Sequence, residues 1–324
     1  MPKKAISKPS FTIPVGISAC LLGDQVRYNG GHSRSLFCLE TLNNYFDYQR
    51  FCPEVAAGFS TPRPSMRLVG DPENPRLTFT KNETADLTEQ LVNGFQSALD
   101  RCVHLDGYIL MKNSPSCGLE RIKVYQENEH PHTIRTRGLF ADALIKKYPL
   151  LPVEEEGRIN DAGLCENFIM RVYAHYHFRH DVLEKPTYHN LLQYHSSYKY
   201  LLMAHSQSAY RELGQLLAVS SKEALEPLLV EYQTQFMQAI SKPAKRGSHC
   251  NALQHILGYL KKTVSGEERQ GIMDVITQYQ NEEVNLATPV ALLNHYIKRT
   301  GSDYIRAQRY LEPYPAALGL RNRV

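Results

Sequence analysis

The sequence lacks several features that would assign it to a common class of protein. No apolar run approaches the roughly 20 residues that a membrane-spanning helix requires. Residues 1–14 contain Lys3, Lys4 and Lys8 but no apolar stretch of the kind found in signal peptides. No Cys-X-X-Cys pair occurs, which argues against a zinc ribbon or a thioredoxin-like dithiol. We therefore expect a cytoplasmic protein that does not associate with a membrane.

The sequence also carries only a small excess of positive over negative charge. The net charge is +4, and all of it lies in residues 166–324, which hold 18 Lys and Arg against 14 Asp and Glu. A surplus of this size is compatible with RNA contact and equally with an ordinary solvated surface. Seven cysteines are present, and an odd number cannot all pair within one chain. In the cytoplasm such residues are more often thiols, metal ligands or catalytic groups than disulfides.

The length of 324 residues favours two domains. Strand and helix patterns alternate in the first half, which predicts an α/β domain with a mostly parallel sheet and helices on both faces. After the acidic run at residues 154–156 the strand signals stop, so we place the boundary at residue 165 and expect domains at 1–165 and 166–324. The second is predicted to be all-α. Predicted strands cover 13–19, 48–51, 107–111 and 122–125, with a hairpin through 66–69 and 76–80. Predicted helices cover 33–45, 84–103, 139–147, 164–179, 188–206, 210–219, 221–240, 247–262, 265–281, 289–299 and 303–311.

Three cysteines stand at the ends of strand-like runs and beside Pro or Gly: Cys20, Cys52 and Cys117. The carboxyl ends of parallel strands share one edge of a sheet, where ligands commonly bind, so we expect these thiols to meet there. Thiolates are soft ligands suited to iron-sulfur clusters, zinc or copper. A cluster with four irons and three protein thiolates keeps one iron open. The competing interpretation is that each is a small buried apolar residue, which we favour for Cys38, Cys102, Cys165 and Cys250.

Residues that can move protons lie next to these cysteines. Glu54 follows Cys52 by two positions and can act as a general base toward water, whereas its alternative role is a cap or a surface acid. Ser114 and Ser116 precede Cys117 and can hydrogen-bond a leaving atom, or simply form the turn. Arg27 and Tyr28 are placed to border a substrate pocket. Asn29, followed by two glycines, most simply makes a turn.

Three blocks of the first half resemble the thiouracil desulfidase family. They are residues 17–23 with 26–30, residues 52–58 with 61–63, and the Ser-Pro-Ser-Cys-Gly block at 114–118. The resemblance implies a Rossmann-like fold, a 4Fe-4S cluster and hydrolytic removal of sulfur from thiolated pyrimidines. It also implies the role of each motif residue. The cluster ligands would be Cys20, Cys52 and Cys117. The catalytic residues would be Glu54 and one of the two serines Ser114 and Ser116. The substrate would be bound by Ser18, Arg27, Tyr28 and Asn29.

The second half is similar to a helical domain that occurs fused behind desulfidase domains. The motifs that carry this similarity are residues 195–206, 249–262 and 310–315. The fused proteins resemble the tRNA 4-thiouridine desulfidases, so tRNA is the expected partner, bound through lysines, arginines and tyrosines of the helical domain. Two alternatives stay open: a desulfidase of free thiouracil or thiouridine, and a non-catalytic, cluster-bearing RNA-binding or sensor protein. We expect a monomer.

Overall fold

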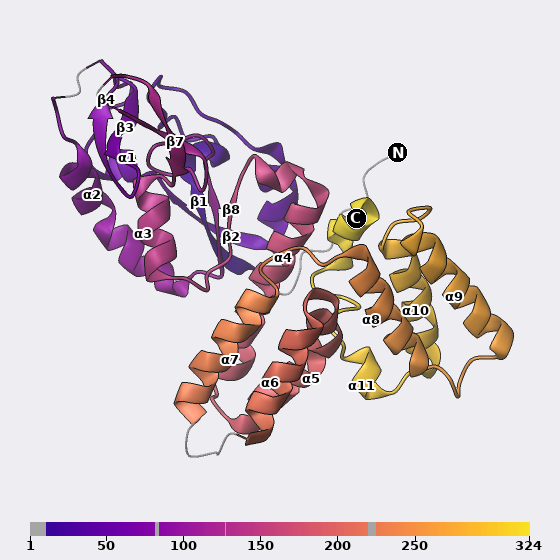
Figure 1. The fold of residues 1–324 in the computed structure, drawn as a ribbon. Helices are drawn as coiled ribbons and strands as arrows, with labels where there is room; N and C mark the ends of the chain where they lie inside the picture. Colours follow the sequence, from indigo (N-terminus) through magenta and orange to yellow (C-terminus); the bar gives the residue numbers. More distant parts are fainter. Residues whose placement is uncertain (1–10, 82–83, 127, 220–224) are drawn as a thin grey trace. The chain divides into compact units, whose positions relative to one another are not determined.

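The computed structural model describes residues 11–81, 84–126, 128–219 and 225–324 (Figure 1). The chain divides after Asn160 into two compact units, each described by itself below. Helix α4 (Ala162–His177) begins the second unit, and the Asp161 side chain caps it by accepting a hydrogen bond of 2.9 Å from the Leu164 N–H. The predicted boundary at residue 165 therefore lies inside the first turn of α4. Within the described ranges, no helix has the length and apolar character needed to cross a membrane.

The first unit is built on a four-stranded parallel sheet, which confirms the predicted α/β class. Its strands are β1 (Ile13–Ser18), β2 (Phe46–Phe51), β5 (Gly107–Leu110) and β8 (Val153–Glu155), in the order β2-β1-β5-β8. Strand β8 is absent from the predicted elements because it is short and acidic. Its Glu154 and Glu155 are buried, which the sequence pattern did not indicate.

Two helices cover this sheet, α2 (Thr88–Arg101) and α3 (Leu139–Lys147), and they lie side by side (Figure 1). Phe140 of α3 lies at the centre of the packing between the helices and the sheet. Its ring centroid is 5.4 Å from that of Phe95 of α2, 5.6 Å from that of Tyr108 of β5 and 5.4 Å from that of Phe51 of β2. Burying one such side chain stabilises the fold by roughly 1.5–3 kcal/mol. Gly16 of β1 lies under Tyr108, where a Cβ would come within 2.3 Å of the ring. A side chain at that position would therefore push the helices off the sheet.

The segment between β1 and β2 differs from its prediction. In place of a regular helix over 33–45 it forms a π-helical turn (Phe37–Thr41) and a 3-10 turn (Leu42–Asn44). Asn44 Nδ2 donates to the carbonyls of Glu40 (3.0 Å) and Thr41 (3.3 Å). Side-chain bonds of this kind compete with helical backbone hydrogen bonds, which explains the irregular turn.

A second sheet, also of four strands, was not predicted. The predicted hairpin is present as β3 (Met66–Asp71) and β4 (Asn74–Phe79), but β6 (Ile122–Tyr125) pairs with β3 instead of joining the main sheet. Strand β7 (Pro131–Thr136) completes the order β4-β3-β6-β7. Short helix α1 (Pro53–Ala56) follows β2 directly.

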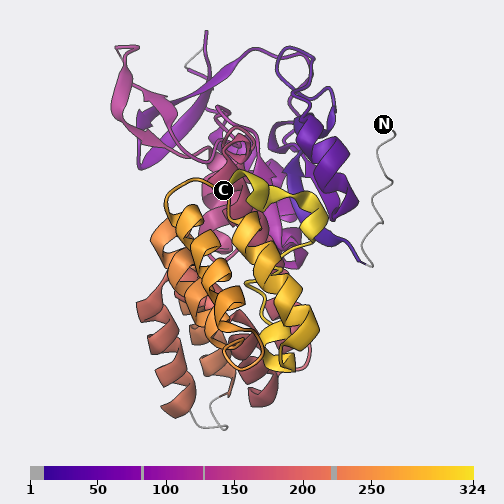
Figure 2. The same ribbon diagram turned by 90° about the vertical axis from the view of Figure 1, so that its right-hand side faces the viewer.

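The second unit is all-helical, as predicted, with its longer helices roughly side by side in Figure 2. Part of the predicted helix 221–240, residues 221–224, lies outside the described residues. The last helix is shorter than predicted and ends at Arg306. The helices that follow α4 are α5 (Tyr188–His205), α6 (Gln207–Val219), α7 (Leu225–Ala239), α8 (Arg246–Gly258), α9 (Gly266–Gln280), α10 (Ala287–Thr300) and α11 (Asp303–Arg306).

The core of this unit satisfies its polar groups through histidine–tyrosine pairs. The Nδ1 atom of His177 lies 2.9 Å from the hydroxyl of Tyr198, and His249 Nδ1 lies 2.9 Å from the hydroxyl of Tyr310. Both histidines are buried. A buried polar group is costly unless it is hydrogen-bonded, so each pair lets two polar side chains enter the core.

Candidate active site

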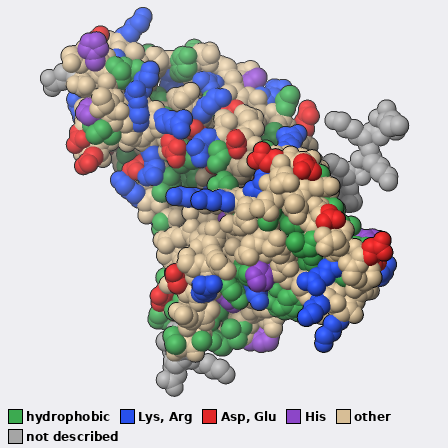
Figure 3. Space-filling model, turned by 45° about the vertical axis from the view of Figure 1, so that its right-hand side comes forward, with side chains coloured by type: hydrophobic (Ala, Val, Ile, Leu, Met, Phe, Trp, Pro, Cys, Tyr) green, Lys and Arg blue, Asp and Glu red, His purple; other side chains and the backbone are tan. Residues whose placement is uncertain are grey.

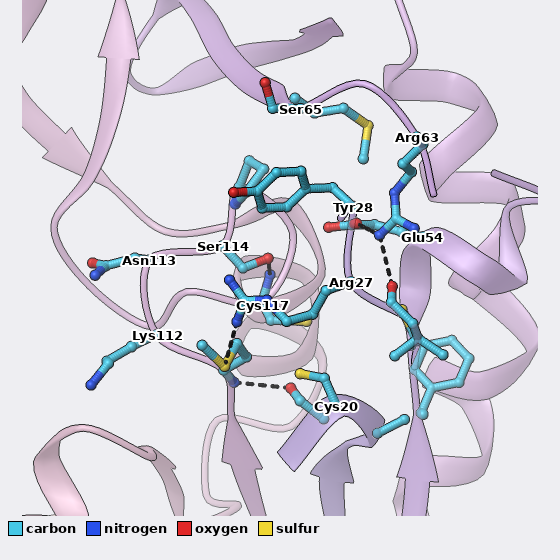
Figure 4. A pocket seen from close by; sticks show the side chains of 18 residues that line it. Cys20, Arg27, Tyr28, Glu54, Arg63, Ser65, Lys112, Asn113, Ser114 and Cys117 are labelled. Carbon is cyan, nitrogen blue, oxygen red and sulfur yellow. Dashed lines mark hydrogen bonds and ion pairs between the residues drawn. The ribbon is translucent and has the colours of Figure 1, made fainter. Parts of the chain in front are cut away.

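A cavity of about 220 Å³ lies at the carboxyl ends of β1, β2 and β5 (Figure 4). Cys20 is in the turn after β1, Cys52 directly follows β2, and Cys117 is in the loop after β5. These strands are neighbours in the sheet, so their ends meet. The structure thus brings to one cavity three thiols that are far apart in the sequence. The full lining is Ser18, Ala19, Cys20, Val26, Arg27, Tyr28, Phe51, Cys52, Glu54, Arg63, Ser65, Met66, Met111, Lys112, Asn113, Ser114, Pro115 and Cys117.

The loop that carries Cys117 is held by the start of helix α3. The N–H groups of Leu139 and Phe140 donate to the carbonyls of Pro115 (3.1 Å) and Ser116 (2.9 Å). The first N–H groups of a helix have no partner inside it, so these loop carbonyls satisfy them. Gly138 is required for this approach, because a Cβ there would come within 2.5 Å of the Ser116 carbonyl carbon. The packing of α3 therefore fixes the position of the Cys117 thiol.

The three thiols share a buried setting. Burial raises the pKa of Cys20 to about 11, although nearby Arg27 partly offsets it. Burial also raises the pKa of Cys52, and it raises that of Cys117 well above the usual value. Negative charge on Cys52 or Glu54 raises the pKa of Cys117 further. Without a cation among them, the thiols are therefore held protonated.

The side chains around the cavity include three sulfur donors that could bind a metal ion or a metal cluster. Within the part of the chain that the structure describes, no three Cys, His, Asp or Glu side chains are close enough to share a single metal ion. Cys20, Cys52 and Cys117 nevertheless line one cavity, and soft thiolates are the usual ligands of iron-sulfur clusters. The donor chemistry of these three residues therefore fits an iron-sulfur group.

Glu54 is held from two sides at the edge of the cavity. Ser116 Oγ donates a hydrogen bond of 2.8 Å to Glu54 Oε1, and the Arg63 guanidinium pairs with Oε2 (Figure 4 shows the pair with Arg63). The Glu54 side chain is 12% exposed and that of Arg63 only 2%. A carboxylate has about four lone-pair sites, so Glu54 keeps acceptor capacity for a further donor in the cavity.

Arg63 was missed among the predicted site residues. Its guanidinium also donates to the carbonyls of Val26 (3.0 Å) and Ser60 (3.1 Å). Its backbone N–H donates to the Tyr28 carbonyl at 2.8 Å. One side chain therefore links Glu54 to the loop that carries Arg27 and Tyr28. Two features of the sequence could have indicated this role. Arg63 is part of the Thr-Pro-Arg motif, and a buried carboxylate such as that of Glu54 needs a cation beside it.

The two serines, which sequence reasoning did not distinguish, have different surroundings. Ser114 lines the cavity, and its Oγ accepts hydrogen bonds from the backbone N–H groups of Ser116 (3.2 Å) and Cys117 (3.1 Å). Its own hydroxyl proton is left to donate. Ser116 is fully buried, is not part of the lining and donates to Glu54. Ser114 is thus placed to contact a ligand, and Ser116 to orient the carboxylate.

Of the four predicted substrate-binding residues, Ser18, Arg27 and Tyr28 line the cavity. Ser18 Oγ accepts a hydrogen bond of 2.9 Å from the Met111 N–H, which ties the end of β1 to the end of β5. Asn29 does not belong to the lining. Its Oδ1 accepts a hydrogen bond of 3.1 Å from the Gly31 N–H, so it forms the turn that was its alternative role. Lys112, Asn113 and Met66 also line the cavity and were not predicted.

Comparisons with known proteins match both units. Residues 15–156 match the 2-thiouracil desulfurase family, and residues 199–315 match the family described as a protein of unknown function, DUF1722. YbgA of Escherichia coli (strain K12), an uncharacterized protein, is 33% identical over 133 residues, which are 41% of this chain and 79% of YbgA. YbbK of Bacillus subtilis (strain 168), also uncharacterized, is 36% identical over 111 residues, which are 32% of this chain and 71% of YbbK. Among solved structures, the 4Fe-4S-dependent thiouracil desulfidase TudS is 28% identical. The similarity covers 48% of this chain and 98% of TudS, with a TM-score of 0.37.

Proposed function

This chain belongs to the families of YbgA and YbbK, and we propose that it is an iron-sulfur-dependent desulfidase of 4-thiouridine in tRNA. It joins a 2-thiouracil desulfurase domain to a DUF1722 domain. The reaction is a hydrolysis that gives uridine and hydrogen sulfide. The observation that carries the proposal is the meeting of Cys20, Cys52, Cys117 and Glu54 around one cavity.

In this proposal the three cysteines hold a 4Fe-4S cluster. When bound, such a group supplies a Lewis-acidic iron without a protein ligand, which suits the soft sulfur of a thiocarbonyl. Each thiol must lose its proton to become a ligand, so loading of the site releases protons. Arg27, which already opposes the effect of burial on Cys20, lies beside the resulting negative charge.

The residues of the chain then perform proton transfers. The Glu54 carboxylate, held by Arg63 and Ser116, accepts one proton from a water molecule that attacks C4 of the thiolated ring. The C4–S bond breaks as the C4–O bond forms, and the Ser114 hydroxyl donates a hydrogen bond to the departing sulfur. Water supplies the oxygen of the product and the protons of hydrogen sulfide. No oxidant or reductant is consumed.

Two features support a nucleic-acid substrate. Arg27 and Lys112 line the cavity, where cationic side chains suit the phosphates next to a nucleotide. The helical unit carries a surplus of Lys and Arg, and on the face seen in Figure 3 these side chains lie among acidic ones. A surplus of Lys and Arg is compatible with contact to the phosphates of an RNA.

The proposal is tested with protein reconstituted anaerobically with iron and sulfide. Sulfide release is measured from tRNA that contains 4-thiouridine, from 4-thiouridine nucleoside and from free 4-thiouracil. We expect the highest kcat/KM with tRNA. A kcat/KM for the free compounds that equals or exceeds the value for tRNA favours the free-base alternative. Binding of tRNA with no sulfide released from any substrate favours the non-catalytic alternative and contradicts the proposal.

A further inference from the structure

A second cavity, of about 420 Å³, lies within the helical unit and has no part in the proposed desulfidase chemistry. One face of α5 forms its floor, with His195, Ser196 and Lys199 at helical spacing. Tyr210 of α6 and Tyr304 of α11 form its walls. Aromatic rings and a single cation therefore surround the open space.

Two of the rings that line this cavity lie in nearly parallel planes. The His195 and Tyr210 rings are 7° from parallel, with centroids 5.9 Å apart. Lys199 Nζ lies 5.8 Å from the Tyr210 ring centroid and 5.4 Å from that of Tyr200, within the range of cation–π contact. Across the described residues, Lys199 has no carboxylate within the 4.0 Å of an ion pair. Its charge is thus balanced by ring faces alone and is available to an anion.

The walls are held in place before any ligand arrives. Gln308 Nε2 donates to the Ser196 carbonyl at 3.0 Å, and the Arg309 N–H donates to the Ser197 carbonyl at 2.9 Å. These bonds tie the segment after α11, and with it Tyr304, to α5. A preformed site loses less entropy on binding than one that must first be ordered.

His195 adds a polar group without adding charge. Its Nδ1 lies 3.1 Å from the Tyr232 hydroxyl, which fixes the ring and leaves Nε2 for another partner. Burial, together with the charge of the neighbouring Lys199, lowers the pKa of His195 to about 4, so the imidazole is neutral at pH 7. The cavity thus presents flat ring faces, one cation, one neutral imidazole and the Ser196 hydroxyl.

We propose that this cavity binds one nucleotide unit, with its base against Tyr210 and its phosphate at Lys199. Bases stack on tyrosine rings whatever their sequence, and lysine is a common partner of phosphate. The unpaired lysine disfavours a cationic ligand in the same space. The inference goes beyond the proposed function, because it assigns a nucleotide site to residues of the helical unit. The nucleotide is either free or part of an RNA strand.

The test uses the full chain and calorimetric titration with UMP, uridine and a single-stranded uridine hexanucleotide. None of them carries sulfur, so binding is read without turnover and independently of the desulfidase reaction. We expect UMP to bind more tightly than uridine, and Lys199→Gln to remove that difference. Tyr210→Leu is expected to weaken UMP binding about fivefold or more, the cost of one lost stacking contact, whereas Tyr210→Phe keeps it. Lys262→Gln, which removes an exposed lysine outside the cavity, is the charge-matched control.

The two sources of the nucleotide give different results. A hexanucleotide that binds much more tightly than UMP identifies the ligand as RNA, and equal affinities identify a free nucleotide. Thermal unfolding verifies that each variant is folded, and the NMR signal of the His195 ring reports binding at this cavity in the unaltered chain. UMP affinity that is unchanged in folded Lys199→Gln and Tyr210→Leu, or a His195 signal that UMP does not shift, would overturn the proposal.

Discussion

Ser116 Oγ donates a hydrogen bond of 2.8 Å to Glu54 Oε1 and so joins the loop after β5 to helix α1. This contact separates the roles of the two serines. We expect Ser116→Ala to lower kcat about tenfold with iron content unchanged, because Glu54 loses one of its two supports. Glu54→Gln should lower kcat about a hundredfold or more, the usual effect of removing a general base. Sulfide assays on iron-loaded protein test both, and full kcat in Ser116→Ala would contradict the assigned role.

Arg63 is expected to contribute to stability as well as to the site. Arg63→Met leaves the buried Glu54 carboxylate without its cation and should lower the free energy of unfolding by about 3 kcal/mol. The matched control is Arg50→Met. Arg50 and Asp24 form an ion pair at 2.9 Å, but their side chains are 59% and 31% exposed, so its loss should cost under about 1 kcal/mol. Urea unfolding measures both, and equal losses would argue against a buried ion pair.

The cysteines give a test of cluster binding that does not depend on activity. Cys20→Ser, Cys52→Ser and Cys117→Ser should each lose most of the bound iron after anaerobic reconstitution. Cys102→Ser is the control, because Cys102 is also buried but lies outside the cavity. Iron content and the visible absorption of the protein are the readouts. Iron bound equally well by all four variants would show that the three thiols are not the ligands.

Much of the first unit was predictable because its signals are local. Helix α3 occupies its predicted residues, 139–147, since apolar residues there repeat at helical spacing. The apolar runs before the cysteines placed them at strand ends. The rule that ligands bind at the carboxyl edge of a parallel sheet then predicted that the three thiols lie close to one another.

The missed features depend on contacts between distant residues. Strand β8 was missed because Glu154 and Glu155 look exposed in the sequence. Glu154 is buried through its pairing with Arg158 Nε (2.7 Å), and Glu155 through its hydrogen bond from the Leu119 N–H (3.0 Å). The role of Arg63 likewise depends on Glu54, nine positions away.

Acid should destabilise the helical unit through its buried histidines. Burial lowers the pKa of His177 to about 3, with Arg309 adding to the effect, whereas an unfolded histidine titrates near 6.5. Below pH 6.5 the unfolded state therefore binds a proton that the folded state does not, and stability falls until about pH 3. For His177 the loss between pH 7.5 and pH 5 is about 2 kcal/mol. Unfolding at both pH values checks this, and His177→Phe should remove that part of the loss. The same pH dependence in His177→Phe and the unaltered chain would contradict it.

In the proposed reaction, water replaces sulfur at this cavity with the help of Glu54. The most direct measurement is anaerobic turnover of 4-thiouridine in tRNA in ¹⁸O-labelled water, without added reductant. We expect one sulfide for each uridine formed, ¹⁸O at C4 of the product, and loss of both signals in iron-loaded Glu54→Gln. Uridine without ¹⁸O, or undiminished sulfide release by Glu54→Gln, would contradict it.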